Sequence, residues 1–163
     1  MRLLDSLDQT TGCAAPPHRR ADIQILVDYF SAWNDHDVSA ILSLLSDDAT
    51  YVGPMATDQL GGRALRREID WLWASFPDLW FDIESLDRHD DESAVAQWVM
   101  HGTNTGPILG FGPTHRRVRL AGADFFRFRH GLISGIRSHF DSVNLVRQLG
   151  IDIVIRRGEE AVP

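Results

Sequence analysis

The sequence predicts an α+β fold in which a curved antiparallel (mixed) sheet wraps around about three N-terminal helices. Three observations predict it. Apolar residues recur at helical spacing in the first half of the chain, and strands with period-two alternation fill most of the second half. One of these strands also carries a single acid on its apolar face. Helices followed by a meander of strands are typical of α+β proteins, and such a sheet can close into a cone around an apolar pocket.

The helical spacing defines three helices before Phe76. They are expected over 22–34, 38–45 and 63–75. Asp22 is the expected N-cap of the first helix, whose apolar stripe includes Tyr29 and Trp33. Between the second and third helices, the residues predict a break at Asp47-Asp48, a short strand over 49–52 and an irregular loop over 53–62.

The second half of the chain has the pattern of strands. They are expected over 79–84, 94–103, 117–129 and 132–140, followed by a short helix over 142–149. His130-Gly131 is the expected turn between the last two strands, and Asp141 is the expected N-cap of the last helix. The glycine- and proline-rich segment 106–114 is a long connection, expected at the mouth of the pocket.

Composition limits the classes of function. The 163 residues suit one domain over 21–152, with flexible tails over 1–20 and 153–163. A net charge of −7 argues against a nucleic-acid partner, and no apolar run is long enough for a membrane span. The single cysteine and the absence of a signal-peptide pattern lead us to expect a cytoplasmic protein. No histidine pair has metal-ligand spacing and no phosphate-binding glycine motif is present, so neither a metal nor another cofactor is expected.

The strand over 117–129 carries the strongest functional signal. Four arginines occupy one face, whereas the other face is apolar except for Asp124. An unpaired carboxylate among apolar groups is costly, so it usually takes up a proton or finds a strong donor. Asp124 is therefore a candidate functional group.

The chain resembles the nuclear transport factor 2-like superfamily and, within it, the SnoaL-like polyketide cyclase group. The likeness spans residues 21–150. It rests on short motifs in a characteristic order: Tyr29-Phe30-Ser31-Ala32-Trp33, Ser46-Asp47-Asp48-Ala49-Thr50-Tyr51, Phe76-Pro77-Asp78, Gly102-Thr103-Asn104-Thr105-Gly106-Pro107, Asp124-Phe125-Phe126-Arg127-Phe128 and Phe140-Asp141.

This resemblance implies two catalytic positions. In the related steroid Δ-isomerases, a tyrosine of the first helix and an acid of the penultimate strand form an oxyanion hole, and these positions match Tyr29 and Asp124. In those isomerases the acid stays neutral, so that it can donate a hydrogen bond. The isomerase base falls on Gly53 and the acid of the aldol cyclases falls on Ser138, so neither usual base is present.

The remaining candidates are a second proton-transfer group and a set of pocket-wall residues. His101 is the alternative base. The expected substrate-binding residues are Trp33, Trp73, Trp98, Met100, Phe126 and Ser138. The arginine face is expected to meet solvent or a second subunit, since members of the superfamily often dimerise through the outer sheet face.

Two classes of function remain open. The first is a cyclase or isomerase acting on a hydrophobic, polyketide-like intermediate in antibiotic biosynthesis. A base-free pericyclic closure of the [4+2] type fits the missing bases, because the pocket would only need to mould the substrate. The second is a non-catalytic binding or dimerisation module, and hydrolysis of an epoxide or ester is a third interpretation. A deep cavity with Asp124 and Tyr29 on its wall would favour the enzyme.

Overall fold

The computed structural model describes residues 17–55 and 60–152. Its helices are Pro17–Asn34 (α1), Val38–Ser43 (α2), Gly62–Ser75 (α3) and Ser142–Gln148 (α4). Its strands are Leu45–Val52 (β1), Leu60–Gly61 (β2), Trp80–Arg88 (β3), Ser93–Thr103 (β4), Arg117–Arg129 (β5) and Leu132–Phe140 (β6).

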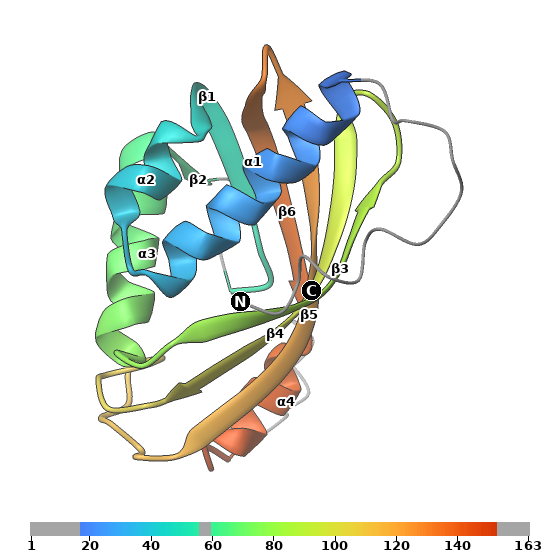
Figure 1. The fold of residues 1–163 in the computed structure, drawn as a ribbon. Coiled ribbons are helices and arrows are strands. Elements are labelled where there is room, and N and C mark those ends of the chain that lie inside the picture. The colour runs from blue at the N-terminus through green and yellow to red at the C-terminus, as the bar shows by residue number, and fades with distance from the viewer. Residues whose placement is uncertain (1–16, 56–59, 153–163) are drawn as a thin grey trace, which may run out of the picture.

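The six strands form one mixed sheet in the order β2-β1-β6-β5-β4-β3. β1 runs parallel to β6, and every other neighbouring pair is antiparallel. The sheet bends strongly, with α1, α2 and α3 on its concave side (Figure 1). The predicted α+β class and the curved sheet around the N-terminal helices are confirmed.

The two faces of β5 divide as the alternation predicts. Arg117, Arg119, Arg127 and Arg129 are exposed, whereas Val118, Leu120, Asp124, Phe126 and Phe128 are buried. On the inner side, Phe126 makes edge-to-face contacts with Tyr29 and Phe30 of α1. Burying these rings against the helix stabilises the domain and places Asp124, two residues before Phe126, on the inner wall.

The C-terminal end of α1 is held against the edge strand β3. The side-chain amide of Asn34 donates to the Phe81 carbonyl at 2.9 Å and accepts from the Phe81 N–H at 2.7 Å. His36 Nε2 lies 2.8 Å from the Leu79 carbonyl oxygen. Asn34 thus replaces the missing neighbour of an edge strand, and the contact fixes the helix turn that carries Tyr29 and Trp33.

A second amide holds α4 against β5. Beyond the pair Gly122↔Phe140, β5 has no β6 partner. There the Arg119 N–H donates to Gln148 Oε1 at 2.8 Å, and Gln148 Nε2 donates to the Arg119 carbonyl at 2.9 Å. Asp141 caps the helix by accepting from the Asn144 N–H, as predicted. The short helix therefore closes the end of the sheet.

The connection between β4 and β5 is organised by Asn104, which is fully buried. Its Nδ2 donates to the carbonyls of Ser75 and Gly106, and its Oδ1 accepts from the N–H and hydroxyl of Thr114. A Cβ at Gly106 would lie 2.0 Å from the Ala74 carbonyl oxygen, so only glycine allows this close approach. The connection is therefore packed tightly on the C-terminal end of α3.

Several boundaries differ from the prediction. β1 begins at Leu45 and runs through Asp47-Asp48, which we expected to end a helix. Leu45 pairs with Ile133 of β6, and Arg129 binds the Asp48 carboxylate, so tertiary pairing overrides the local pattern. β3 extends to Arg88 rather than 84, and the short β2 lies in the predicted loop.

At the N-terminus, α1 begins at Pro17 instead of near Asp22, because proline is well accepted in a first helical turn. The remaining residues of the two predicted tails, 1–16 and 153–163, lie outside the described residues, as does Cys13. The turn His130-Gly131 is confirmed, with φ of 53° and 76°, the left-handed values that suit a two-residue hairpin turn.

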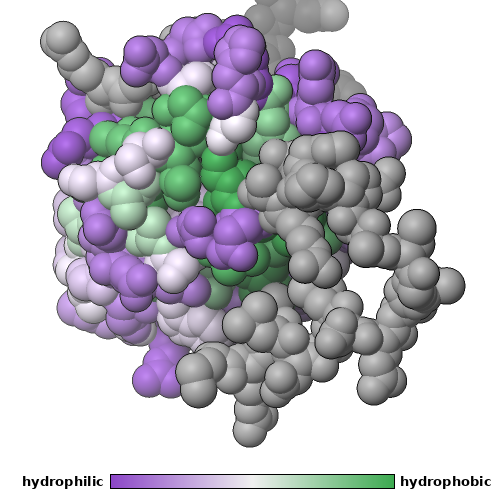
Figure 2. Space-filling model, turned by 45° about the horizontal axis from the view of Figure 1, so that its top comes forward, coloured by the Kyte–Doolittle hydropathy of each residue, from purple (hydrophilic) through white to green (hydrophobic). Residues whose placement is uncertain are grey.

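One face of the molecule shows apolar side chains gathered in a central area bordered by hydrophilic ones (Figure 2). Within the described ranges, no helix combines the length and the apolar character that a bilayer crossing requires.

Candidate functional site

A cavity of about 100 Å³ lies between the helices and the inner face of the sheet. Its walls come from α1, α3 and α4 and from five strands, mostly as apolar side chains. An apolar cavity of about 150 Å³ holds benzene, so this one, at about 100 Å³, is smaller than the space such a ring occupies and must widen to admit one. Five of its lining residues carry a hydroxyl or carboxyl group: Tyr29, Tyr51, Glu68, Asp124 and Ser138.

Asp124 is the most unusual of the five, with 7% of its surface exposed. It pairs directly with Ser138 across β5 and β6. Burial raises the pKa of Asp124 to about 6, although the side-chain donors of Ser138 and Trp98 offset part of this rise. The Trp98 N–H is thus near enough to Asp124 to lower its pKa but, within the described part of the chain, neither Asp124 Oδ1 nor Trp98 Nε1 makes a regular hydrogen bond.

Tyr29 reaches the same cavity from α1, as the resemblance implied. Burial, and then the negative charge of Asp124, raise its pKa far above the ordinary value. Its phenol consequently stays neutral and remains a hydrogen-bond donor. Phe126 and Trp33 hold the ring by edge-to-face contacts at centroid distances of 5.5 and 6.4 Å.

Tyr51, which our interpretation of the sequence did not include in the site, lies where the missing base would be. A Cβ built on Gly53 would lie 2.4 Å from the Tyr51 hydroxyl oxygen. The phenol thus occupies the space of a side chain at position 53. Burial, and then the charge of Asp124, raise the pKa of Tyr51 to about 12. The sequence signal was a glycine two residues after an aromatic residue, just beyond the end of β1, a spacing that in extended chain puts both on one face.

A second glycine makes room for Trp98. Gly122 and Trp98 are direct partners in the β4–β5 pairing, and a Cβ on Gly122 would lie 2.4 Å from the indole ring. The six-membered part of the indole therefore lies over Gly122, and Trp98 lines the cavity together with Asp124.

We expect Gly53→Ala to destabilise the protein by about 1–3 kcal/mol, because the new methyl group overlaps the Tyr51 phenol and the packed interior resists the shift. Equilibrium urea unfolding measures this. The matched control is Gly112→Ala, where a Cβ meets nothing within 4 Å and the change should stay within about 0.5 kcal/mol. Equal effects of the two substitutions would contradict the placement of Tyr51.

Glu68 of α3 is the other lining residue that we did not predict. It is half-buried, and burial raises its pKa. Its position three residues after Leu65 and four before Leu72 puts it on the apolar stripe of the helix, and that spacing was the available signal.

The structure brings most of the predicted wall residues together. Trp33, Trp98, Met100 and Ser138 line the cavity with Asp124 and Tyr29. Trp73 and Phe126 do not line it. Trp73 stacks on His36 at 4.8 Å and contacts Trp33 edge-on, and Phe126 packs beneath Tyr29, so both support lining residues from behind.

His101, the predicted alternative base, does not line the cavity. It lies on the opposite side of β4 from Trp98 and Met100 and stacks on the exposed Trp80 at 4.3 Å. An odd-numbered position on this strand faces outward, whereas the cavity residues have even numbers. The strand geometry therefore keeps His101 away from Asp124.

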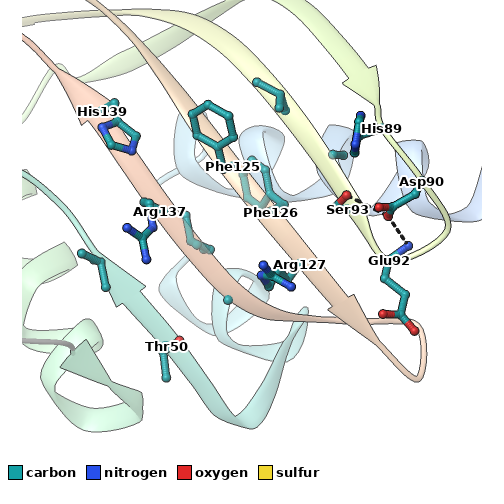
Figure 3. Close-up of a pocket in the computed structure, with 15 residues that line it drawn as sticks. Thr50, His89, Asp90, Glu92, Ser93, Phe125, Phe126, Arg127, Arg137 and His139 are labelled. Carbon is teal, nitrogen blue, oxygen red and sulfur yellow. Dashed lines mark hydrogen bonds between the residues drawn. The ribbon is translucent and has the colours of Figure 1, made fainter.

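A larger groove of about 740 Å³ lies on the outer face of the sheet (Figure 3). Phe125 and Arg127 of β5 and Arg137 and His139 of β6 line it. Its acid Asp90 accepts hydrogen bonds from the Glu92 N–H at 2.9 Å and the Ser93 hydroxyl at 2.7 Å, which close the β3–β4 turn. Because Asp124, the buried acid with a raised pKa, lies in the inner cavity together with Trp98 and Tyr29, that cavity is the candidate active site.

Comparisons with known proteins agree with this fold. A family model described as SnoaL-like polyketide cyclase matches residues 23–149. No curated protein sequence matches the chain.

Three solved structures illustrate the similarity of the fold. A SnoaL-like polyketide cyclase candidate from Jannaschia sp. CCS1 has a TM-score of 0.77 at 16% identity, covering 87% of this chain and 100% of that chain. TsrD from Streptomyces laurentii has a TM-score of 0.71 at 26% identity, covering 81% of this chain and 96% of that chain. SalBIII, an epoxide hydrolase/cyclase-like enzyme with a role in pyran ring formation in the polyether salinomycin, has a TM-score of 0.66 at 22% identity, covering 77% of this chain and 95% of that chain.

Proposed function

The chain belongs to the SnoaL-like polyketide cyclase family, and we propose that it is a cofactor-independent cyclase or isomerase acting on a hydrophobic, polyketide-like intermediate. One observation carries this proposal. The apolar cavity holds a buried carboxyl group with an unpaired oxygen, beside a neutral tyrosine. Unpaired buried groups are costly to the fold, which is the pattern of a site whose partner is a substrate.

Asp124 and Tyr29 would act on one carbonyl oxygen of the substrate. In its protonated form, Asp124 donates one hydrogen bond to this oxygen and the Tyr29 phenol donates another. Both bonds strengthen as negative charge develops on the oxygen, so they lower the barrier to a reaction that polarises the carbonyl. The apolar walls exclude water and hold the chain of the substrate in a folded shape.

A pericyclic closure of the [4+2] type suits such a site, because it needs a polarised carbonyl and a mould but no base. The absence of the usual bases at Gly53 and Ser138 supports this choice. The similarity to SalBIII, which has a role in forming a pyran ring, is consistent with ring closure. The unpaired groups favour an enzyme over a binding module whose cavity is filled by side chains. Epoxide or ester hydrolysis is the second candidate function, because SalBIII is epoxide hydrolase/cyclase-like.

Deleting the gene in its host tests this function. Cyclisation and isomerisation conserve composition, so the deletion strain should accumulate a compound of the same mass as the lost product but with a different retention time in liquid chromatography–mass spectrometry. Complementation with the wild-type gene should restore the product, whereas Asp124→Ala, which removes the hydrogen-bond donor, should not. Accumulation of a compound lighter by one water would instead indicate a hydrolase. An unchanged metabolite profile would contradict the proposal.

We also propose that the protein acts in the cytoplasm, in antibiotic biosynthesis, as a homodimer that pairs through the outer sheet face. Phe125 is 48% exposed there, between arginines of β5 and β6 and the acidic turn near Asp90. An exposed ring among charges of both signs suits a contact between two copies.

Phe125→Glu should convert this dimer to a monomer, since it puts a carboxylate where the ring would be buried. Sedimentation equilibrium would show the apparent mass falling to half. Val143→Glu is the control, because Val143 is a similarly exposed apolar residue on α4. A monomeric wild-type protein, or an unchanged mass for Phe125→Glu, would contradict the dimer.

A further inference from the structure

We propose that the substrate of this cavity carries a protonated amine and that Glu68 of α3 is the counter-ion of that amine. The inference rests on the proposed function, because Asp124 and Tyr29 hold the carbonyl oxygen of the same substrate. It adds the chemical class of the substrate, which is a hydrophobic amino ketone with its carbonyl group deep in the cavity and its ammonium group at the helix side.

The charge of the cavity wall is the first argument. Two of its lining residues are acids, Asp124 and Glu68, and among the residues that the structure describes no lysine, arginine or histidine lines it. The net charge of the whole chain, −7, has the same sign. A cleft with acids set in apolar walls of low dielectric attracts cations and repels anions. The site therefore selects for a positively charged ligand.

The aromatic side chains around Glu68 are the second argument. Trp71 lines the cavity from the same helix, three residues later, so its ring and the carboxyl group of Glu68 are neighbours. Burial, the charge of Asp124 and, to a smaller extent, the charge of Glu68 raise the pKa of Tyr51, so Tyr51 of β1 lies near both acids. A carboxylate beside two aromatic rings suits an alkylammonium ion, because the ring faces attract the cation and the carboxylate neutralises it.

The third argument is that the carboxyl group of Glu68 has no partner among the residues that the structure describes, either in a hydrogen bond or in an ion pair. On the exposed side of α3, Arg66 pairs instead with Asp70, with 3.7 Å between Arg66 Nε and Asp70 Oδ2. Burial raises the pKa of Glu68, so its carboxylate is partly desolvated. Such a carboxylate gains more from a bound cation than one that water or an arginine already surrounds.

The burial of these residues orients the substrate. Asp124 and Tyr29 are buried, whereas Glu68 and Trp71 are half-buried. An uncharged carbonyl group loses less than an ammonium group when it leaves water, so the carbonyl suits the deep end and the ammonium group suits the end near solvent. Because the cavity measures only about 100 Å³, a single chain fits between the two ends more easily than a ring.

Two ketones of the same shape test the inference. The amine 5-(dimethylamino)pentan-2-one is a cation at neutral pH, and 6-methylheptan-2-one has an uncharged CH group in place of the protonated nitrogen. Titration calorimetry measures the affinity of each ketone. We expect wild-type protein to bind the amino ketone at least about tenfold more tightly, from the ion pair and the aromatic contacts together. Glu68→Gln should abolish this preference, because its amide carries no charge, with a much smaller change in the affinity for the neutral ketone.

Asp70→Asn is the matched control, because it removes the same charge from the exposed side of α3 and should keep the preference. A preference that survives Glu68→Gln but is lost in Asp124→Asn would make Asp124 the counter-ion and overturn the inference. An equal loss of affinity for both ketones in Glu68→Gln would also overturn it, since Glu68 would then only shape the cavity. Equal binding of the two ketones by the wild type would overturn the inference and leave the pairing of Asp124 with Tyr29. If the wild type binds neither ketone, the proposed function itself fails.

Discussion

Replacing Asp124 by Asn should raise the free energy of unfolding at pH 8 by about 3 kcal/mol. The cause is the pKa of Asp124, which burial raises from 3.8 to about 6. Above pH 6 the folded protein holds a buried carboxylate that the unfolded chain exposes to water at no such cost. The amide of asparagine has nearly the same shape and carries no charge. A substitution that removes the buried charge from the site should thus strengthen the fold, as is common for functional residues.

The stability gained by Asp124→Asn should depend on pH. Between pH 3.8 and 6 the folded state binds more protons at Asp124 than the unfolded state, so the contribution of Asp124 to stability falls as the pH rises through that window and is constant above it. Urea unfolding of the wild type and Asp124→Asn at a series of pH values isolates this contribution. The two stabilities should converge near pH 4 and separate up to about pH 6.

Asp78 provides a control, because its substitution should change the stability at pH 8 in the opposite direction. Burial acts to raise its pKa, but hydrogen bonds from the Thr103 N–H and hydroxyl lower it on balance. Asp78→Asn should therefore lose stability at pH 8 relative to wild type, and this difference should shrink in acid. If Asp124→Asn also destabilises at pH 8, the carboxyl group of Asp124 is a structural acid with strong partners.

Gly122→Ala should destabilise the protein by about 1–3 kcal/mol and weaken the binding of a small ketone by about tenfold or more. A Cβ at this position lies 2.4 Å from the Trp98 indole, whose ring must then move into a cavity of only about 100 Å³. Binding of cyclohexanone, followed by calorimetry, and urea unfolding measure the two effects.

A second substitution tests the cause. The atoms that would overlap belong to the six-membered part of the indole, so Trp98→Phe removes them and should recover much of the lost stability in the Gly122→Ala background. Gly135→Ala is the matched control in the same sheet, because a Cβ there makes only ordinary contacts, the nearest at 3.5 Å. If Trp98→Phe gives no recovery, the indole is not what limits position 122.

The fold was largely predictable because its signals are local and repeated. Alternation along β5 divided the arginines from the apolar face and placed Asp124 inward, and His130-Gly131 marked its turn. The start of β1 was not predictable in this way, because Leu45 to Asp48 are strand only through pairing with β6 and the contact of Asp48 with Arg129. The local sequence pattern does not show which distant residues a strand will pair with.

The site was predicted in part. Asp124 and Tyr29 were found from an acid in an apolar row and a matching helix position, and both line the cavity. His101 does not line this cavity, in line with the odd-numbered position that it holds on its strand. Tyr51 and Glu68 were missed because their positions in the cavity depend on neighbouring residues. Gly53 leaves the space that the Tyr51 phenol occupies, and Glu68 lies on the otherwise apolar stripe of α3. Gly53 looked like a missing functional group, whereas it makes room for an aromatic wall, as Gly122 does for Trp98.

The central claim is that a protonated Asp124 and the Tyr29 phenol donate to one carbonyl oxygen. Carbon-13 NMR of cyclohexanone labelled at its carbonyl carbon tests this most directly, because donated hydrogen bonds move that resonance downfield. Glu68→Gln protein serves as the background, so that Asp124 is the one carboxyl group of the cavity, among the residues described, that titrates; Tyr29 and Tyr51 stay neutral in this range. We expect a downfield shift at pH 5 that disappears with a midpoint at about pH 6, persists at all pH values in Asp124→Asn, and shrinks in Tyr29→Phe. A bound ketone whose resonance does not change with pH, and is the same in all three proteins, would contradict the claim.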